Sequence, residues 1–203
     1  MNSTKSLAVE NFENIAVIRF IRPEIKNPLS IETLRNLKEI FPALESNPNI
    51  ETIIFTGSGD TFASGANLRE IADTNADNAR EFALRGQNLM QTIYHSNKLT
   101  VAAIDGFCMG GALDLALACK IRIASSRSIF AHPGVGLGII TGWGGTQMLP
   151  RLIGEAKALE MFLTTKRVEA DEALHIGLID KIAAQPLGFA LANYGAKKSS
   201  IDL

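Results

Sequence analysis

The sequence predicts an α/β protein built around a mainly parallel sheet. Short apolar or β-branched runs, typical of strands, alternate with longer segments in which apolar residues recur at helical spacing. Strands and helices that alternate in this way are typical of parallel α/β architecture. Of the 203 residues, 46% are hydrophobic, which is enough to bury a sizeable core. We therefore expect one compact globular unit.

The first half of the chain supplies two predicted strands and two predicted helices. The apolar run 15–21 predicts a strand, which ends because a proline follows and cannot donate to a ladder. Ser30 is a suitable N-cap for a helix over 31–44, where apolar residues repeat at helical spacing. The run 51–56 predicts the next strand, and a long amphipathic helix follows at about 77–95.

The second half continues the same alternation. Its predicted elements are a strand at 101–104, a small-residue helix at 110–118, a strand at 121–124, helices at 155–164 and 169–175, and a short strand at 178–182. Gly177 is the expected C-cap of the last helix, because glycine adopts the left-handed conformation without a steric cost.

Composition and charge exclude several classes of function. The 20 Lys and Arg residues balance 21 Asp and Glu residues without a long block of either sign, so we expect no nucleic-acid partner. No signal-like segment opens the chain and no apolar run approaches the roughly 18 residues of a membrane span, so we expect a cytoplasmic protein without membrane contact. Cys108 and Cys119 are too few for a disulfide framework, and no Cys or His pair has zinc-ligand spacing. We therefore expect no metal. Phe62 stands where a dinucleotide motif needs its third glycine, so neither NAD nor FAD is expected.

The most informative stretch is TVAAIDGFCMGG at 100–111, where a predicted strand meets a glycine pair and a helix begins. Amides at the start of a helix lack intrahelical acceptors, and the macrodipole favours negative charge there. Gly111 is therefore a candidate donor to a developing oxyanion. The small-residue loop TFASGANL at 61–68 brings a second candidate donor, the amide of Ala66. Two such donors on one oxygen form an oxyanion hole.

These motifs resemble those of a known family. Residues 57–68, GSGDTFASGANL, resemble the pattern G-x-G-x-x-F-x-x-G-A-D-L of the crotonase (enoyl-CoA hydratase/isomerase) superfamily, with asparagine in place of aspartate. Residues 104–125, IDGFCMGGALDLALACKIRIAS, resemble its second signature. The resemblance continues through 130–154 and 171–182, so it covers nearly the whole chain.

The resemblance implies a spiral of repeated ββα units that assembles as a homotrimer or hexamer. It implies an enzyme of fatty acid metabolism that binds an acyl-CoA thioester and stabilises its enolate between Ala66 and Gly111, with coenzyme A as part of the substrate rather than a separate cofactor. By matched position, the implied CoA contacts are Ile25, Lys26, Ser64, Asn67 and Leu68. The acyl pocket is expected to involve Phe107, Gly134, Ile139, Ile140 and Trp143.

The catalytic positions depart from the family pattern. Hydratases that resemble this chain use two glutamates, whose matched positions are Asp114 and Gly134. Asp114, on the first turn of its helix, can act as an acid or base, and it can equally stabilise the helix start. Gly134 has no side chain and can do neither. His132 nearby has an intrinsic pKa suited to acid-base catalysis at neutral pH, and it can equally serve as a hydrogen-bonded loop residue. Asp114 and His132 are the predicted catalytic residues.

The C-terminal region also departs from the family. The resemblance implies a longer helical tail than this chain has, so we expect a spiral core over 1–185 and a shortened helical region over 186–203.

Three alternatives to an enoyl-CoA hydratase or isomerase stay open. One is a different crotonase reaction, because dienoyl-CoA isomerases resemble the chain in having aspartate at position 114 and dihydroxynaphthoyl-CoA synthases in having glycine at position 134. Another is a serine hydrolase of the Clp-like spiral fold with Ser64, His132 and Asp114 as its triad, although no nucleophile-elbow motif supports it. The third is a family member that binds acyl-CoA without turnover.

Overall fold

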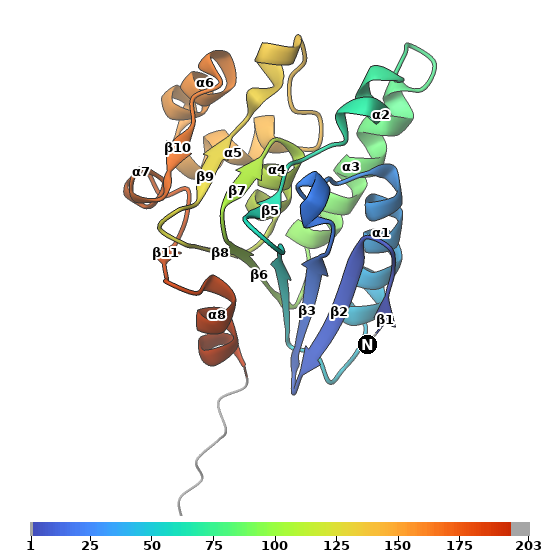
Figure 1. Cartoon of the computed structure of the whole chain (residues 1–203), viewed down its shortest axis with the longest axis vertical. Helices are drawn as coiled ribbons and strands as arrows, with labels where there is room; N and C mark the ends of the chain where they lie inside the picture. Colours follow the sequence, from blue (N-terminus) through green and yellow to red (C-terminus); the bar gives the residue numbers. More distant parts are fainter. Residues whose placement is uncertain (1, 196–203) are drawn as a thin grey trace, which may run out of the picture.

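The computed structural model describes residues 2–195 and confirms the predicted α/β architecture (Figure 1). Its larger sheet has seven strands in the order β1-β2-β3-β4-β6-β8-β11. The strands are β1 (Asn2–Ser3), β2 (Leu7–Phe12), β3 (Ile15–Phe20), β4 (Thr52–Thr56), β6 (Leu99–Ile104), β8 (Ile121–Ala124) and β11 (Lys181–Ile182). From β3 to β11 all neighbours are parallel, and β1 and β2 extend the sheet in antiparallel fashion.

A second sheet has four short strands in the order β10-β9-β7-β5. They are β5 (Thr61–Ala63), β7 (Phe107–Met109), β9 (Ile129–Ala131) and β10 (Val168–Glu169). β5, β7 and β9 run parallel, and each directly follows one strand of the larger sheet. A helical segment follows each pair of strands, so the ββα repeat that the resemblance implies is confirmed.

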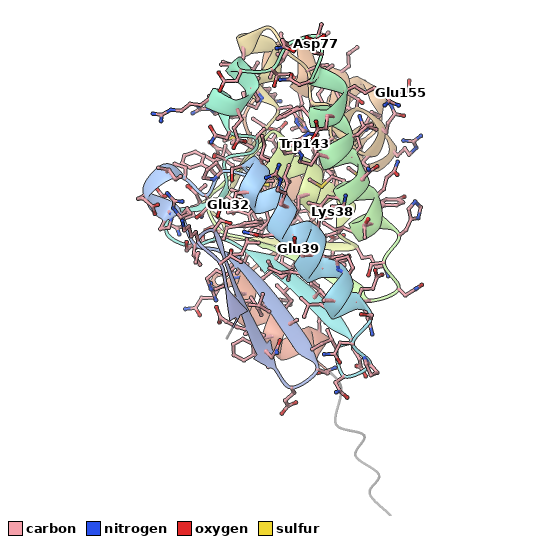
Figure 2. The ribbon with its side chains drawn as sticks, turned by 90° about the vertical axis from the view of Figure 1, so that its right-hand side faces the viewer. Glu32, Lys38, Glu39, Asp77, Trp143 and Glu155 are labelled. Atoms are coloured by element: carbon pink, nitrogen blue, oxygen red, sulfur yellow. The ribbon has the colours of Figure 1, made fainter. Side chains whose placement is uncertain are left out.

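Most of the helices lie where the sequence pattern predicts them. They are α1 (Ile31–Glu45), α2 (Leu68–Ala72), α3 (Ala79–Tyr94), α4 (Gly111–Ala118), α5 (Gly145–Ile153), α6 (Glu155–Thr164), α7 (Ala170–His175) and α8 (Pro186–Tyr194), with 3₁₀ turns at Pro23–Ile25 and Pro133–Leu137. Ser30 caps α1 as predicted, since its Oγ accepts a hydrogen bond from the Thr33 amide at 3.1 Å. Figure 2 shows Glu32, Lys38 and Glu39 on the outward face of α1, as expected for an amphipathic helix.

Some short elements differ from the prediction. The strand expected at 178–182 shrinks to β11, because Gly177 has a φ of +77° and the amides of Leu178 and Ile179 turn back to the Ala173 carbonyl. The sequence pattern did not reveal β1, β2, β5, β7, β9 and β10, nor helix α5. Five of these strands have only two or three residues and are too short to show a period of two, whereas β2 has six residues and was not recognised as a strand.

Alternate residues of the parallel strands feed two hydrophobic cores. In β4, Ile53 and Phe55 join the main core under α1 and α3, whereas Ile54 points to the opposite face. A strand places successive side chains on opposite faces, so one run of apolar residues fills both cores. The second core lies against α8, which contributes Ala190.

Helix α8 lies in the region that the sequence assigned to a shortened tail. It covers one face of the sheet formed by β4, β6 and β8, so it packs as part of the described structure. Residues 196–203 of that predicted region lie outside the described residues, and the division at residue 185 stays a prediction. In the described part of the chain, no helix has the length and apolar character needed to cross a bilayer.

Candidate active site

The candidate site lies at the carboxyl ends of the parallel strands in the four-stranded sheet. The strands β5, β7 and β9 are parallel, so the loops that follow them meet at one edge. Ligand sites of open α/β sheets form at such carboxyl ends of strands. The Gly110 amide donates to the Ala131 carbonyl at 2.9 Å, which joins the end of β7 to the end of β9.

Two glycines allow the first two loops to approach each other closely. Gly65 has a φ of +90°, and a Cβ built on it would lie 2.5 Å from the Met109 carbonyl oxygen and 3.0 Å from the Gly111 amide nitrogen. Gly110, with a φ of +53°, turns the chain into α4. Only glycine accepts both this backbone conformation and this proximity at position 65. The Gly65–Ala66 segment is therefore held beside the first amide of α4.

These loops enclose a small cavity of about 100 Å³. Its lining includes many of the predicted site residues, namely Ser64, Ala66, Leu68, Gly111, His132, Gly134, Ile139, Ile140 and Trp143. The predicted oxyanion donors, four of the five predicted acyl-pocket residues and one predicted catalytic residue are thus brought together. The oxyanion hole that the sequence predicts between the Ala66 and Gly111 amides stays a prediction.

Phe107 does not line this cavity. It begins β7, where it pairs with Thr61 and Ile129, so it lies at the end of the strand opposite to Met109 and the glycine pair. The expected role of Phe107 in the acyl pocket therefore has no support in the geometry.

The predicted CoA contacts form a group next to the cavity. The Ser64 amide donates to the Lys26 carbonyl at 3.0 Å, which joins the 3₁₀ turn at Pro23–Ile25 to the loop after β5. Ile25 and Leu68 are exposed, and Lys26 forms an ion pair of 2.8 Å with Asp60.

The side chain of Asn67 forms a hydrogen bond within its own segment of the chain. Its side chain accepts from the Arg69 amide and caps α2. None of the five predicted CoA contacts is thereby confirmed as a ligand contact, and their role stays a prediction.

Asp114 is fully buried behind the cavity. It lies in the first turn of α4, its side chain is 0% exposed, and it is not among the residues that line the cavity. Its Oδ2 accepts a hydrogen bond from the Thr141 hydroxyl. The backbone amides of Trp143 and Gly145 also bond to the carboxylate.

His132 is the titratable residue at the cavity wall. Its side chain is 2% exposed, its ring packs on Phe162 with centroids 5.1 Å apart, and its Nε2 lies 3.6 Å from Asp114 Oδ1. Among the buried side-chain atoms of the described residues, only Asp114 Oδ1 and the two ring nitrogens of His132 lack a hydrogen-bond partner. No hydrogen bond therefore joins His132 to Ser64, as the serine-hydrolase alternative would need.

Burial shifts the pKa values of Asp114 and His132 in the directions that favour their uncharged forms. Desolvation raises the pKa of Asp114 from 3.8 to about 7, against the hydrogen bonds from Thr141, Trp143 and Gly145, which stabilise the carboxylate. Desolvation lowers the pKa of His132 from 6.5 to about 4. Groups with shifts of this size are common at catalytic sites.

Gly134 leaves no room for a second carboxylate. A Cβ at this position would lie 2.8 Å from the Ile139 carbonyl oxygen, a backbone atom. In the described residues, no group of His, Cys, Asp or Glu side chains could hold a metal ion.

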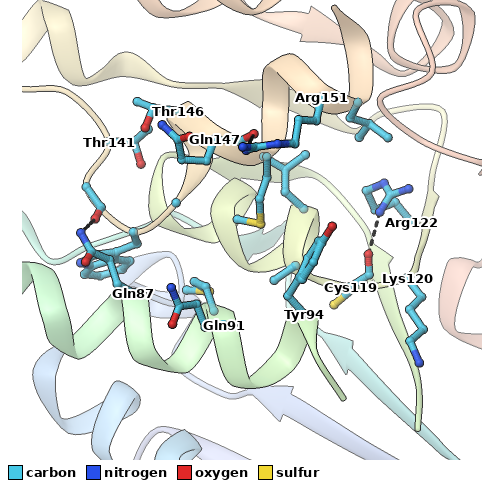
Figure 3. A pocket seen from close by; sticks show the side chains of 18 of the residues that line it. Gln87, Gln91, Tyr94, Cys119, Lys120, Arg122, Thr141, Thr146, Gln147 and Arg151 are labelled. Atoms are coloured by element: carbon cyan, nitrogen blue, oxygen red, sulfur yellow. Dashed lines mark hydrogen bonds between the residues drawn. The ribbon is translucent and has the colours of Figure 1, made fainter. Parts of the chain in front are cut away.

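Trp143 lines both the cavity and a larger groove of about 1140 Å³. Figure 3 shows this groove from close by. The indole is 3% exposed and touches both α3 and α4, since Cβ atoms on Gly86 or Gly111 would overlap it at 2.2 and 2.4 Å. The groove contains side chains of α3 such as Gln87, whose amide donates to the Gly142 carbonyl at 2.7 Å. It includes neither Ala66 nor Gly111, so it is not the site of an oxyanion.

The sequence analysis missed Thr141. This residue contacts Asp114 across 27 positions of the chain, and a lone threonine between apolar residues gives no periodic or spacing signal. Only the fold brings the two side chains together.

Sequence comparison identifies the relatives of this chain. The profile of the enoyl-CoA hydratase/isomerase family matches residues 10–187. Crotonyl-CoA hydratase of Syntrophomonas wolfei is 40% identical over 179 residues, which are 88% of this chain and 69% of that protein. Short-chain-enoyl-CoA hydratase of Clostridium acetobutylicum is 36% identical over 178 residues, 87% of this chain and 68% of that protein.

Solved structures show the same architecture. Pseudomonas aeruginosa DspI superposes with a TM-score of 0.89 at 35% identity, over 95% of this chain and 80% of that one. Enoyl-CoA hydratase from Bacillus anthracis superposes with a TM-score of 0.86 at 31% identity, over 94% of this chain and 73% of that one. Together with the ββα spiral, these matches show that the chain belongs to the enoyl-CoA hydratase/isomerase family.

Proposed function

We propose that this protein binds an acyl-CoA thioester and catalyses the reversible addition of water to an enoyl-CoA. The observation that carries the proposal is the meeting of the Gly65–Ala66 segment with the Gly111 amide over a cavity that also contains His132. In the proposed reaction, the thioester oxygen accepts hydrogen bonds from the Ala66 and Gly111 amides, which stabilise the enolate. The names of the two hydratases among its relatives support this substrate class.

A second candidate reaction is the shift of a double bond within an enoyl-CoA. Gly134 favours it, because the position of the second glutamate has no side chain and one acid-base pair remains, His132 at the cavity wall and Asp114 beside it. A double-bond shift needs one group that removes a proton and returns it two carbons away. Hydration by the same pair needs that group to activate water and then to protonate the α-carbon.

The test is the loss of enoyl-thioester ultraviolet absorbance when the purified protein meets crotonyl-CoA. Proposed hydration predicts turnover in the wild type and its loss in Asp114→Asn, because the amide cannot carry a negative charge. A 3-enoyl-CoA, whose conversion raises the same absorbance, tests the double-bond shift. Binding of both thioesters without turnover of either would reject the catalytic proposal and leave an acyl-CoA-binding protein.

We further propose that the protein assembles as a homotrimer or hexamer. Leu159 and Leu163 lie one turn apart on α6 and are 56% and 60% exposed, which makes an apolar surface suited to a protein contact. Light scattering coupled to size exclusion tests the assembly, and a monomer at micromolar concentration would contradict it. The cytoplasmic location expected from the sequence stays a prediction.

A further inference from the structure

We infer that His132 is the residue that exchanges protons with the substrate, and that Asp114 behind it is a positioning residue, held in turn by Thr141 from the cavity wall. The inference rests on the proposed function, because it assigns roles within the same cavity. It reverses the order suggested by the sequence, in which Asp114 was the principal acid or base and His132 its helper.

The first argument is the order of the groups in space. His132 lines the cavity, whereas Asp114 does not, and the nearest approach of the two is 3.6 Å between Nε2 and Oδ1. His132 is therefore the member of the pair that belongs to the cavity wall. Nε2 faces the carboxylate, which leaves Nδ1 as the ring nitrogen available to a substrate.

The second argument is that Asp114 is anchored away from the cavity. Its Oδ2 accepts from the Thr141 hydroxyl, and the amides of Trp143 and Gly145 at the start of α5 also bond to the carboxylate. Turning the carboxylate towards a substrate would break these bonds. Gly145 provides the space for this arrangement, since a Cβ there would lie 2.1 Å from Asp114 Oδ1 and 3.0 Å from His132 Cε1.

The third argument is the unused hydrogen-bonding capacity. Asp114 Oδ1, His132 Nε2 and His132 Nδ1 are buried without partners, in contrast to the other buried polar side-chain atoms of the described residues. Leaving such atoms unpaired is costly, so their retention points to a function. A movement of less than about 1 Å would close the hydrogen bond from Nε2 to Oδ1 and leave Nδ1 for the substrate.

The proposed steps balance as follows for hydration. Nδ1 accepts a proton from water while the water oxygen bonds to the β-carbon, and the electrons of the double bond move to the thioester oxygen. The amides of Ala66 and Gly111 hold the resulting enolate, and the Asp114 carboxylate stabilises the imidazolium. The imidazolium then returns its proton to the α-carbon, and the carbonyl forms again.

Kinetics of four variants test these roles. His132→Gln is expected to lower kcat at least about 100-fold, because it removes the proton carrier. Thr141→Val is expected to lower kcat about tenfold, with little change in KM, because a hydrogen bond to a charged group is lost. Removing that donor also raises the proton affinity of Asp114, so the acidic limb of the pH profile moves to higher pH. Thr141→Ser keeps the hydroxyl and is expected to restore rate and profile, and Thr146→Val is the matched control in the neighbouring groove.

A nitrogen NMR measurement of the His132 ring separates this inference from the proposed reaction. We expect Nε2 to carry the proton in the wild type, and Asp114→Asn and Thr141→Val to change that tautomer. If Nε2 carries the proton but the protein does not hydrate crotonyl-CoA, the pairing of His132 with Asp114 is supported and the proposed hydration is rejected. Hydration that survives His132→Gln within about threefold, or a ring protonated at Nδ1, would overturn the inference even if the proposed reaction stands.

Discussion

Replacing Asp114 by asparagine should change the stability of the protein in a way that depends on pH. Burial raises the pKa of the folded Asp114 to about 7, from 3.8 in an exposed carboxyl. The folded protein therefore holds this proton more tightly than the unfolded chain between those two values. The stabilisation is full below the unfolded pKa and is lost as the pH rises through the folded pKa. Asparagine resembles the protonated form at every pH.

The magnitude follows from the two pKa values. Between about pH 5 and about pH 8, the wild type should lose roughly 2.5 kcal/mol of unfolding free energy relative to Asp114→Asn. His132 titrates in the opposite sense, because its folded pKa of about 4 makes the protein less stable as the pH falls below 6.5. Both proteins contain His132, so its contribution largely cancels in the difference.

Urea unfolding followed by tryptophan fluorescence measures this difference. The chain has a single tryptophan, Trp143, which is 3% exposed and whose amide bonds to the Asp114 carboxylate. The free-energy difference between the two proteins should grow with pH up to about 7 and then level off. A constant difference would refute the raised pKa, because a carboxyl with an ordinary or lowered folded pKa is ionised in both states across this window.

The remaining predictions concern glycines and thiols. Gly86→Ala would bring Cβ within 2.2 Å of the Trp143 ring and should cost about 1–3 kcal/mol of unfolding free energy in urea titrations, whereas Gly188→Ala, with its nearest neighbour at 3.6 Å, should add about 0.5–1 kcal/mol. Gly134→Glu meets the Ile139 carbonyl oxygen and should destabilise the protein without faster crotonyl-CoA hydration; a faster rate would contradict this. Burial raises the pKa of both cysteines, so Ellman's reagent should label them only in denaturant, and rapid labelling of the native protein would be inconsistent with their burial.

Local signals explain which parts of the structure the sequence could predict. Ser30 and the helix it caps depend on residues within one or two turns, so the spacing of side chains is sufficient to find them. The approach of Ala66 to Gly111 was predicted from motifs, because each glycine-containing loop has its own local signature. The contact between Thr141 and Asp114 has no such signature, since it depends on how the loop after β9 folds over α4.

Burial is the property that sequence reasoning handled least well at this site. Asp114 was expected to point towards the substrate because it follows Gly111 by three residues on one helix. Helical spacing determines which way a side chain leaves its own helix, but not which other segment covers it. The segment from Thr141 to Gly145 covers Asp114, and this tertiary contact converts a residue with expected access to the substrate into a buried one.

An imidazole paired with a carboxylate suits this cavity better than two carboxylates would. Two carboxylates in about 100 Å³ of buried space would repel each other unless one were protonated. Asp114 and His132 can instead share the Nε2 proton, so the reacting pair carries a single negative charge and becomes neutral overall, as carboxylate and imidazolium, while the substrate is an enolate. One ring then takes the proton and gives it back on the same side of the substrate. With His132 as the only proton carrier at the cavity, hydrogen and hydroxyl would add to one face of the double bond.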